Sequence, residues 1–231
     1  MIKKRMLDWV RLPGGWIQDG GLVDFRWRRE TGANNIAALL SLVAIAQHAD
    51  QETGVAFATY ETLTRATGLS RAKLSAGLDV LAERGIVSRE PDGRSTYGLE
   101  NYDPGSGWAK LPARKLYVDG VLTPFADFHL RKATELDALK LFLLFVQRRG
   151  SDTNMANLGY DKIKEYAGTD GTRVRRALSL LTVSGLIHVE RIPSSQNLLG
   201  VAHGYRIPHL DPYNHMGTRG RALEADVEVP F

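Results

Sequence analysis

The chain has 231 residues, of which 43% are hydrophobic and 24% are charged, a balance typical of globular proteins. This composition excludes a wholly disordered chain, and no apolar run approaches the roughly 18 residues needed to cross a bilayer. Cysteine is absent, which excludes disulfides and thiolate metal sites. We therefore expect a cytoplasmic protein without a membrane segment.

The formal net charge is +4, and the positive charge is unevenly distributed. Residues 1–100 carry 13 Lys and Arg against 12 Asp and Glu, whereas residues 101–200 carry 14 against 10. Local clusters of positive charge favour a phosphate-bearing partner.

In chain order, the first predicted element is a long helix over Ile36–His48, which is apolar on most of its surface and therefore buried. A second, short helix is predicted over Thr59–Ala66. Thr59 can act as its N-cap, and Leu63 points inward.

A turn and a third helix follow, the helix over Ser70–Arg84. Gly68 suits a left-handed C-cap, and the serine suits the next N-cap. The leucines on one face of the third helix predict its buried side, and Gly77 allows another helix to approach closely. These leucines are Leu74, Leu78 and Leu81. Two helices joined by a short turn, with the outer face of the second left free, form a helix-turn-helix.

A β-hairpin is predicted after Gly85. Its strands are Ile86–Glu90 and Ser95–Leu99, and its turn is Pro91–Arg94.

The same pattern recurs 100 residues later, where Tyr60–Glu90 aligns with Tyr160–Glu190 without a gap. The identical pairs are Tyr60/Tyr160, Gly68/Gly168, Leu78/Leu178, Leu81/Leu181, Gly85/Gly185 and Glu90/Glu190. Upstream, Trp9–Pro13 aligns with Trp108–Pro112 at a shift of 99. We interpret the chain as an internal duplication.

The second copy is predicted to contain helices over Leu136–Arg148 and Tyr160–Ala167, and strands over Leu186–Ile192 and Val201–Ile207 around a longer loop. The predicted domains are 1–103, 104–210 and a C-terminal tail, 211–231.

The run ATYETLTRATGLSRAKLSAGLDVLAERGIV resembles the winged helix-turn-helix domains of bacterial regulators and of plasmid and phage replication proteins. The lead-ins WVRLPGGWI and WAKLPARKLY resemble the Leu-Pro segment that precedes such domains in replication proteins. The resemblance implies a mainly α fold with small β wings, arranged as two tandem winged helix-turn-helix domains. It implies sequence-specific binding of double-stranded DNA, either in replication initiation of a plasmid or mobile element or in transcriptional repression of such genes.

In this fold the N-terminal part of each recognition helix enters the major groove. The candidate DNA-binding residues of the first unit are Ser70, Arg71, Lys73 and Ala76, with Arg94 at the wing tip. Those of the second unit are Thr172, Arg173, Arg175 and Arg176. The alternative for these cations is a solvated helix face. Arg26, Arg28 and Arg29 are interpreted as an arm that contacts the DNA backbone.

The second recognition helix is richer in arginine, which favours one dominant DNA reader. A winged-helix scaffold for protein partners is the alternative from another functional class. We expect half-sites about one helical turn apart, roughly 34–36 Å, and a monomer or homodimer.

No catalytic, cofactor or metal site is predicted, and we do not expect an enzyme. His203, His209 and His215 lie six residues apart among prolines and are interpreted as loop residues. The acidic tail ends in Val229–Phe231 and resembles the Pro-Phe tip by which bacterial single-strand-binding proteins recruit replication partners. A frayed terminus is the alternative.

Overall fold

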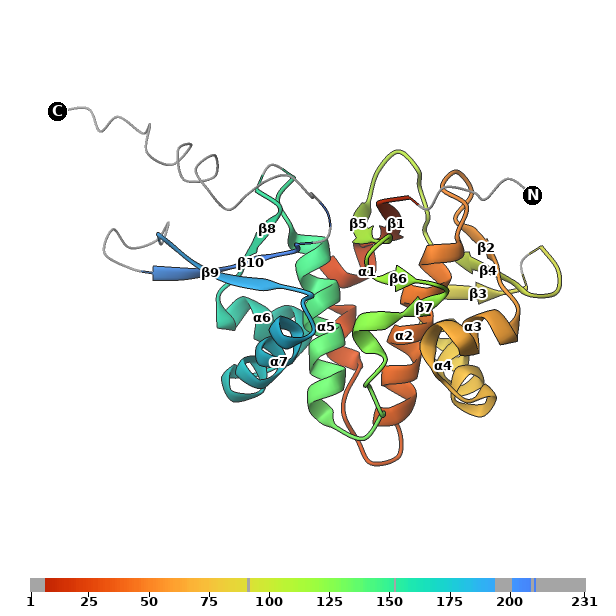
Figure 1. The fold of residues 1–231 in the computed structure, drawn as a ribbon, viewed down its shortest axis with the longest axis horizontal. Coiled ribbons are helices and arrows are strands. Elements are labelled where there is room, and N and C mark those ends of the chain that lie inside the picture. The colour runs from red at the N-terminus through yellow and green to blue at the C-terminus, as the bar shows by residue number, and fades with distance from the viewer. Residues whose placement is uncertain (1–6, 91, 152, 194–200, 209, 211–231) are drawn as a thin grey trace.

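The computed structural model describes residues 7–90, 92–151, 153–193, 201–208 and 210, and this part is mainly helical with small sheets. Helices α2 (Gly32–His48) and α5 (Ala133–Arg148) lie side by side at the centre, and a shorter helix pair lies on either side of them (Figure 1). The flanking helices are α3 (Tyr60–Thr67), α4 (Arg71–Glu83), α6 (Tyr160–Ala167) and α7 (Gly171–Val183). A mixed architecture of this kind is compatible with a winged helix-turn-helix.

The two central helices are buried on almost every side, as their apolar sequences predict. Both begin earlier than the predicted starts at Ile36 and Leu136. Polar side chains explain the extra turns: Asn35 Nδ2 donates to the Arg26 carbonyl at 2.8 Å, and Glu135 accepts backbone N–H groups from the preceding loop.

Each flanking helix pair carries a three-stranded antiparallel sheet. The order is β2-β4-β3 in one sheet and β8-β10-β9 in the other. The strands are β2 (Val55–Phe57), β3 (Val87–Arg89), β4 (Thr96–Leu99), β8 (Met155–Asn157), β9 (His188–Pro193) and β10 (Val201–Arg206). The hairpins confirm the sequence prediction with slightly shifted ends. Strands β2 and β8 were not predicted, because three-residue strands have no periodicity of their own and pair with strands about 40 to 50 residues away.

The two lead-in segments pair with each other, which the sequence alone did not predict. Strand β1 (Trp9–Pro13) runs antiparallel to β5 (Trp108–Pro112), with Arg11 opposite Lys110 at the centre. The rings of Trp9 and Trp108 stack with their centroids 5.4 Å apart. Because equivalent residues exchange places across this pair, the ribbon has an approximate internal two-fold axis.

The remaining lead-in elements cross between the two halves. The turn η1 (Gly21–Asp24) packs against α6, and a Cβ placed on Gly168 would lie 3.4 Å from Val23 Cγ1. In the other half, β7 (Val121–Leu122) packs against α3, and Arg65 Nη2 donates to the Asp119 carbonyl at 3.0 Å. Each lead-in therefore braces the helix pair of the opposite half. The short elements beside them are α1 (Gly15–Gln18), β6 (Tyr117–Val118) and η2 (Thr123–Phe125).

The buried side chains of both halves form one continuous hydrophobic cluster. It includes Leu12 and Phe25 from the first lead-in, Leu39 from α2 and Phe142 from α5. The division at 103/104 stays a prediction about folding units. In the described part of the chain, no helix is both long enough and apolar enough to span a membrane.

Candidate nucleic-acid interface

The turn between α3 and α4 is built by residues whose local preferences fit it, and it confirms the predicted helix-turn-helix geometry. Thr59 caps α3, because its hydroxyl accepts the Thr62 N–H at 3.1 Å. Gly68 ends α3 in the left-handed region at φ +69°, which costs glycine little. Ser70 then caps α4 by accepting the Lys73 N–H at 3.3 Å.

Helix α4 buries one side against α2 and leaves the other exposed. Gly77 makes the contact close: a Cβ there would lie 2.7 Å from the Ala37 carbonyl carbon. On the outer side Ser70 and Arg71 are exposed, and Ala76 is half-buried. Lys73 is also half-buried, and its Nζ donates to Asn34 Oδ1 at 2.9 Å.

The acidic residues on α4 offset part of its positive charge. Asp79 forms an ion pair with Arg89 of β3, whose Nη2 also donates to the Tyr60 hydroxyl at 3.1 Å. Glu83 follows one turn later and is exposed. Consequently the outer face of α4 is close to neutral.

Helix α7 presents a more basic outer face. Asp170 caps its first turn by accepting the Arg173 N–H at 3.4 Å. Thr172, Arg175 and Arg176 are exposed, and no hydrogen bond or ion pair engages these three side chains within the described residues. Two neighbouring guanidinium groups therefore stand free on the side of α7 away from α5.

Arg173 points the other way. Its Nε lies 2.9 Å from Asp137 Oδ2 and its Nη2 lies 2.6 Å from Asp137 Oδ1, which makes a bidentate ion pair with a carboxylate that is 1% exposed. This pairing ties α7 to α5 and engages two of the five N–H donors of the guanidinium. That Arg173 contacts DNA stays a prediction. In the structure its side chain links α7 to α5.

A buried polar network around Asp137 was not predicted from the sequence. Thr169 Oγ1 donates to Asp137 Oδ1 at 3.3 Å, and Lys140 Nζ donates to the Phe25 carbonyl at 3.0 Å. Burial lowers the pKa of Lys140 to about 8, and Asp137 opposes the change. Two charges one turn apart in the otherwise apolar stretch 136–146 were the signal that could have revealed it.

The predicted wing tip and the predicted arm both lie in exposed segments. Arg94 is exposed in the turn between β3 and β4. Arg26, Arg28 and Arg29 are exposed between η1 and α2, and Phe25 beside them packs under the guanidinium of Arg84, whose Cζ lies 4.3 Å from the ring centroid. His203 lies in β10, so the interpretation of this histidine as a loop residue is wrong. The predicted loop over 194–200, the tail over 211–231, His209 and His215 all lie outside the described residues.

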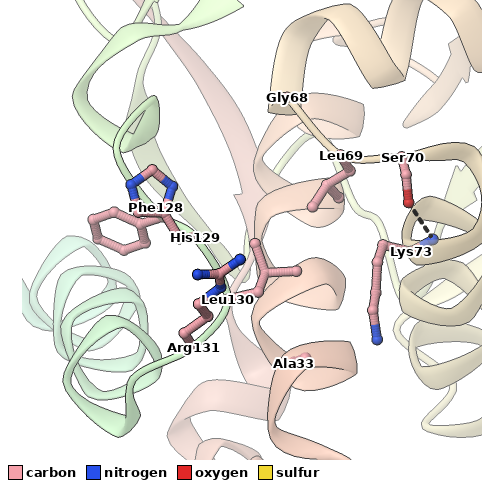
Figure 2. Close-up of a pocket in the computed structure, with 9 residues that line it drawn as sticks. All are labelled: Ala33, Gly68, Leu69, Ser70, Lys73, Phe128, His129, Leu130 and Arg131. Carbon is pink, nitrogen blue, oxygen red and sulfur yellow. Dashed lines mark hydrogen bonds between the residues drawn. The ribbon is translucent and has the colours of Figure 1, made fainter.

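A groove of about 610 Å³ lies beside the turn between α3 and α4. Gly68 to Lys73 form one wall with Ala33, and the second lead-in forms the opposite wall. Figure 2 shows Lys73 on one side and His129 and Arg131 on the other. The residues that line it are Ala33, Gly68, Leu69, Ser70, Lys73, Phe128, His129, Leu130 and Arg131.

Comparison with known proteins gives a match that contains the helix pair α3 and α4. Residues 37–87 match a family model described as a helix-turn-helix domain. The matched segment runs from α2 to the start of β3, so it contains the capped turn and the whole of α4. No curated protein and no solved structure gives a significant match to the chain. The chain therefore carries a helix-turn-helix domain, a kind of domain that supports DNA binding.

Proposed function

We propose that the protein binds double-stranded DNA sequence-specifically through two winged helix-turn-helix units, with α4 and α7 as recognition helices. The observation that carries the proposal is the helix-turn-helix match over residues 37–87, in which α4 keeps an exposed outer face. The same order of helix, strand, two helices and hairpin recurs from α5 to β10, which supports a second reader. The protein then acts by binding rather than by catalysis.

Helix α7 is the dominant reader in this proposal. Arg175 and Arg176 are exposed and unpaired within the described residues, so they can meet guanine edges or phosphates without breaking an existing interaction. Thr172 lies one turn before them, where a hydroxyl reaches phosphate. In the first unit Ser70, Arg71, Lys73 and Ala76 take the corresponding places, and Arg94 approaches the duplex from the wing.

The test replaces Arg175 and Arg176 together. The duplex is one selected for binding to the unaltered protein. We expect R175A/R176A to bind this duplex at least tenfold more weakly in 150 mM salt, because two cationic contacts are lost. If both arginines contact the duplex, the slope of log K against log salt falls by about 2. The measurement is fluorescence anisotropy over a salt series.

The matched control is R114A/K115A, which removes the same charge from an exposed pair in the second lead-in. Arg114 forms an ion pair with Asp8 beside the β1–β5 ribbon, away from both recognition helices. If R175A/R176A matched the unaltered protein in both affinity and salt slope, the assignment of α7 as a reader would be contradicted.

For the biological process we propose replication initiation of a plasmid or mobile element. The tandem organisation and the Leu-Pro lead-ins support it, through their resemblance to replication proteins. A minimal plasmid carrying the selected site should replicate only when the protein is supplied. Repression of a reporter without replication would favour a transcriptional regulator, and neither effect would favour a protein-interaction scaffold.

A further inference from the structure

The loop before α5 carries exposed cations that the helix-turn-helix match does not include. His129, Arg131 and Lys132 are exposed, and none of their side chains has an ion pair or hydrogen bond among the described residues. They belong to the second lead-in, yet His129 and Arg131 line the groove beside the helix pair of the first half, and Lys132 follows them in the chain. Their positive charge therefore adds to the first unit rather than the second.

The buried carboxylate of Glu135 holds the backbone of this loop in place. Glu135, which is 5% exposed, accepts the N–H groups of His129 at 2.8 Å, Arg131 at 2.9 Å and Lys132 at 3.1 Å. These bonds hold Leu130 in the left-handed region at φ +60°, which is unfavourable for a leucine. A buried carboxylate thus fixes the backbone of all three residues without pairing with their side chains.

An aromatic contact also anchors the loop within the second lead-in. Phe128 is buried and packs edge-on against Phe125, with centroids 5.3 Å apart. The segment from Phe128 to Arg131 then forms the wall of the groove opposite Ser70 and Lys73 (Figure 2). A backbone phosphate beside the entry point of α4 would meet cations from both walls.

We propose that His129, Arg131 and Lys132 form a phosphate clamp that binds the DNA backbone next to α4. The clamp rests on the proposed function and deepens it, because the near-neutral face of α4 gives the first unit little charge of its own. Oriented guanidinium and ammonium groups bind phosphodiester oxygens and release counterions from the duplex. The clamp positions the first unit on DNA and does not read bases.

The experiment compares R131A/K132A with the matched control R114A/K115A, which removes one arginine and one lysine from the same lead-in. We expect R131A/K132A to bind the selected duplex about tenfold more weakly in 150 mM salt and to lower the salt slope by about 2. The control should shift neither value by as much. In hydroxyl-radical footprints, protection should weaken at one half-site only. Both side chains are exposed, so thermal unfolding of the variants should match that of the unaltered protein.

Separate outcomes distinguish the clamp from the proposed function. If the unaltered protein binds no duplex, the proposed function fails. If R175A/R176A weakens binding while R131A/K132A behaves like its control, the clamp is overturned and the function stands. If R131A/K132A binds inorganic phosphate more weakly than the unaltered protein does but binds the duplex as its control does, the groove is a site for free anions and the clamp is likewise overturned.

Discussion

Lys140 lies in a largely apolar part of α5, and only 2% of its surface is exposed. Its Nζ donates to the Phe25 carbonyl, so it joins α5 to the first lead-in. Asp137, one turn earlier, pairs with Arg173 and joins α5 to α7. Two charged residues in α5 thereby fix the position of elements from both halves, at the cost of burying an ammonium group.

This burial makes the free energy of unfolding depend on pH. Burial lowers the pKa of Lys140 to about 8, with Arg173 and Arg26 adding to the effect of burial and Asp137 opposing it. Between pH 8 and 10 the folded state loses a proton that the unfolded state keeps, so the free energy of unfolding rises with pH, by at most about 1.4 kcal/mol per pH unit. Lys140→Met should remove this contribution and be at least as stable near pH 7.

Urea unfolding of both proteins from pH 7 to 10 measures the effect. The advantage of the methionine variant should shrink as the pH rises. The buried tyrosines, such as Tyr205 and Tyr97, have raised pKa values and titrate only near or above pH 10, and they are present in both proteins. Parallel stability curves would show that Lys140 does not titrate in this range.

Helices α2 and α4 approach each other closely at Gly77. A Cβ at that position would lie 2.7 Å from the Ala37 carbonyl carbon and 2.8 Å from the Ala38 nitrogen, both backbone atoms of a buried helix. We expect Gly77→Ala to lower the free energy of unfolding by about 1–3 kcal/mol, because the helices must separate. Chemical denaturation monitored by circular dichroism measures the loss.

Gly15→Ala is the control for this substitution. No atom lies within 4 Å of a Cβ placed there, and the residue does not have a positive φ. Its stability should change by less than about 0.5 kcal/mol. If Gly77→Ala unfolds like this control, the α2–α4 contact is more tolerant than its geometry indicates. The equivalent position in α7 is Ala177, so the α5–α7 contact already accommodates a methyl group.

Over the whole molecule, neither half is complete without the other. Strand β1 has β5 as its partner, and each lead-in supports the helix pair of the opposite half. We expect residues 1–103 and 104–231, produced separately, to be poorly folded and to recover helical circular dichroism when mixed. A protease site placed at the exposed Gly105 gives the control, because the cleaved chain should stay associated in size-exclusion chromatography.

Cooperative unfolding of each half on its own, without association on mixing, would contradict this expectation. It would favour the predicted division at 103/104 into independently folding domains. The shared core predicts the opposite result, since separation would expose side chains such as Leu12 and Phe25 to water.

Elements with local signals can be predicted from the amino-acid sequence alone. Thr59, Gly68 and Ser70 marked the ends of α3 and α4, because caps and left-handed turns depend on a few neighbouring residues. The spacing of the leucines gave the buried face of α4, and Gly77 gave its close contact. The outer face of α4 was predicted as the complement of the buried one.

The contacts between segments far apart in the sequence are seen only in the three-dimensional fold. The β1–β5 ribbon, the crossed lead-ins and strand β2 depend on partners far away in the chain, and no local pattern encodes that choice. The ion pair between Arg173 and Asp137 and the position of the loop around Arg131 beside the first helix pair also depend on partners far away in the chain. The cationic residues can be identified from the sequence, but the fold shows which of them are free to contact DNA.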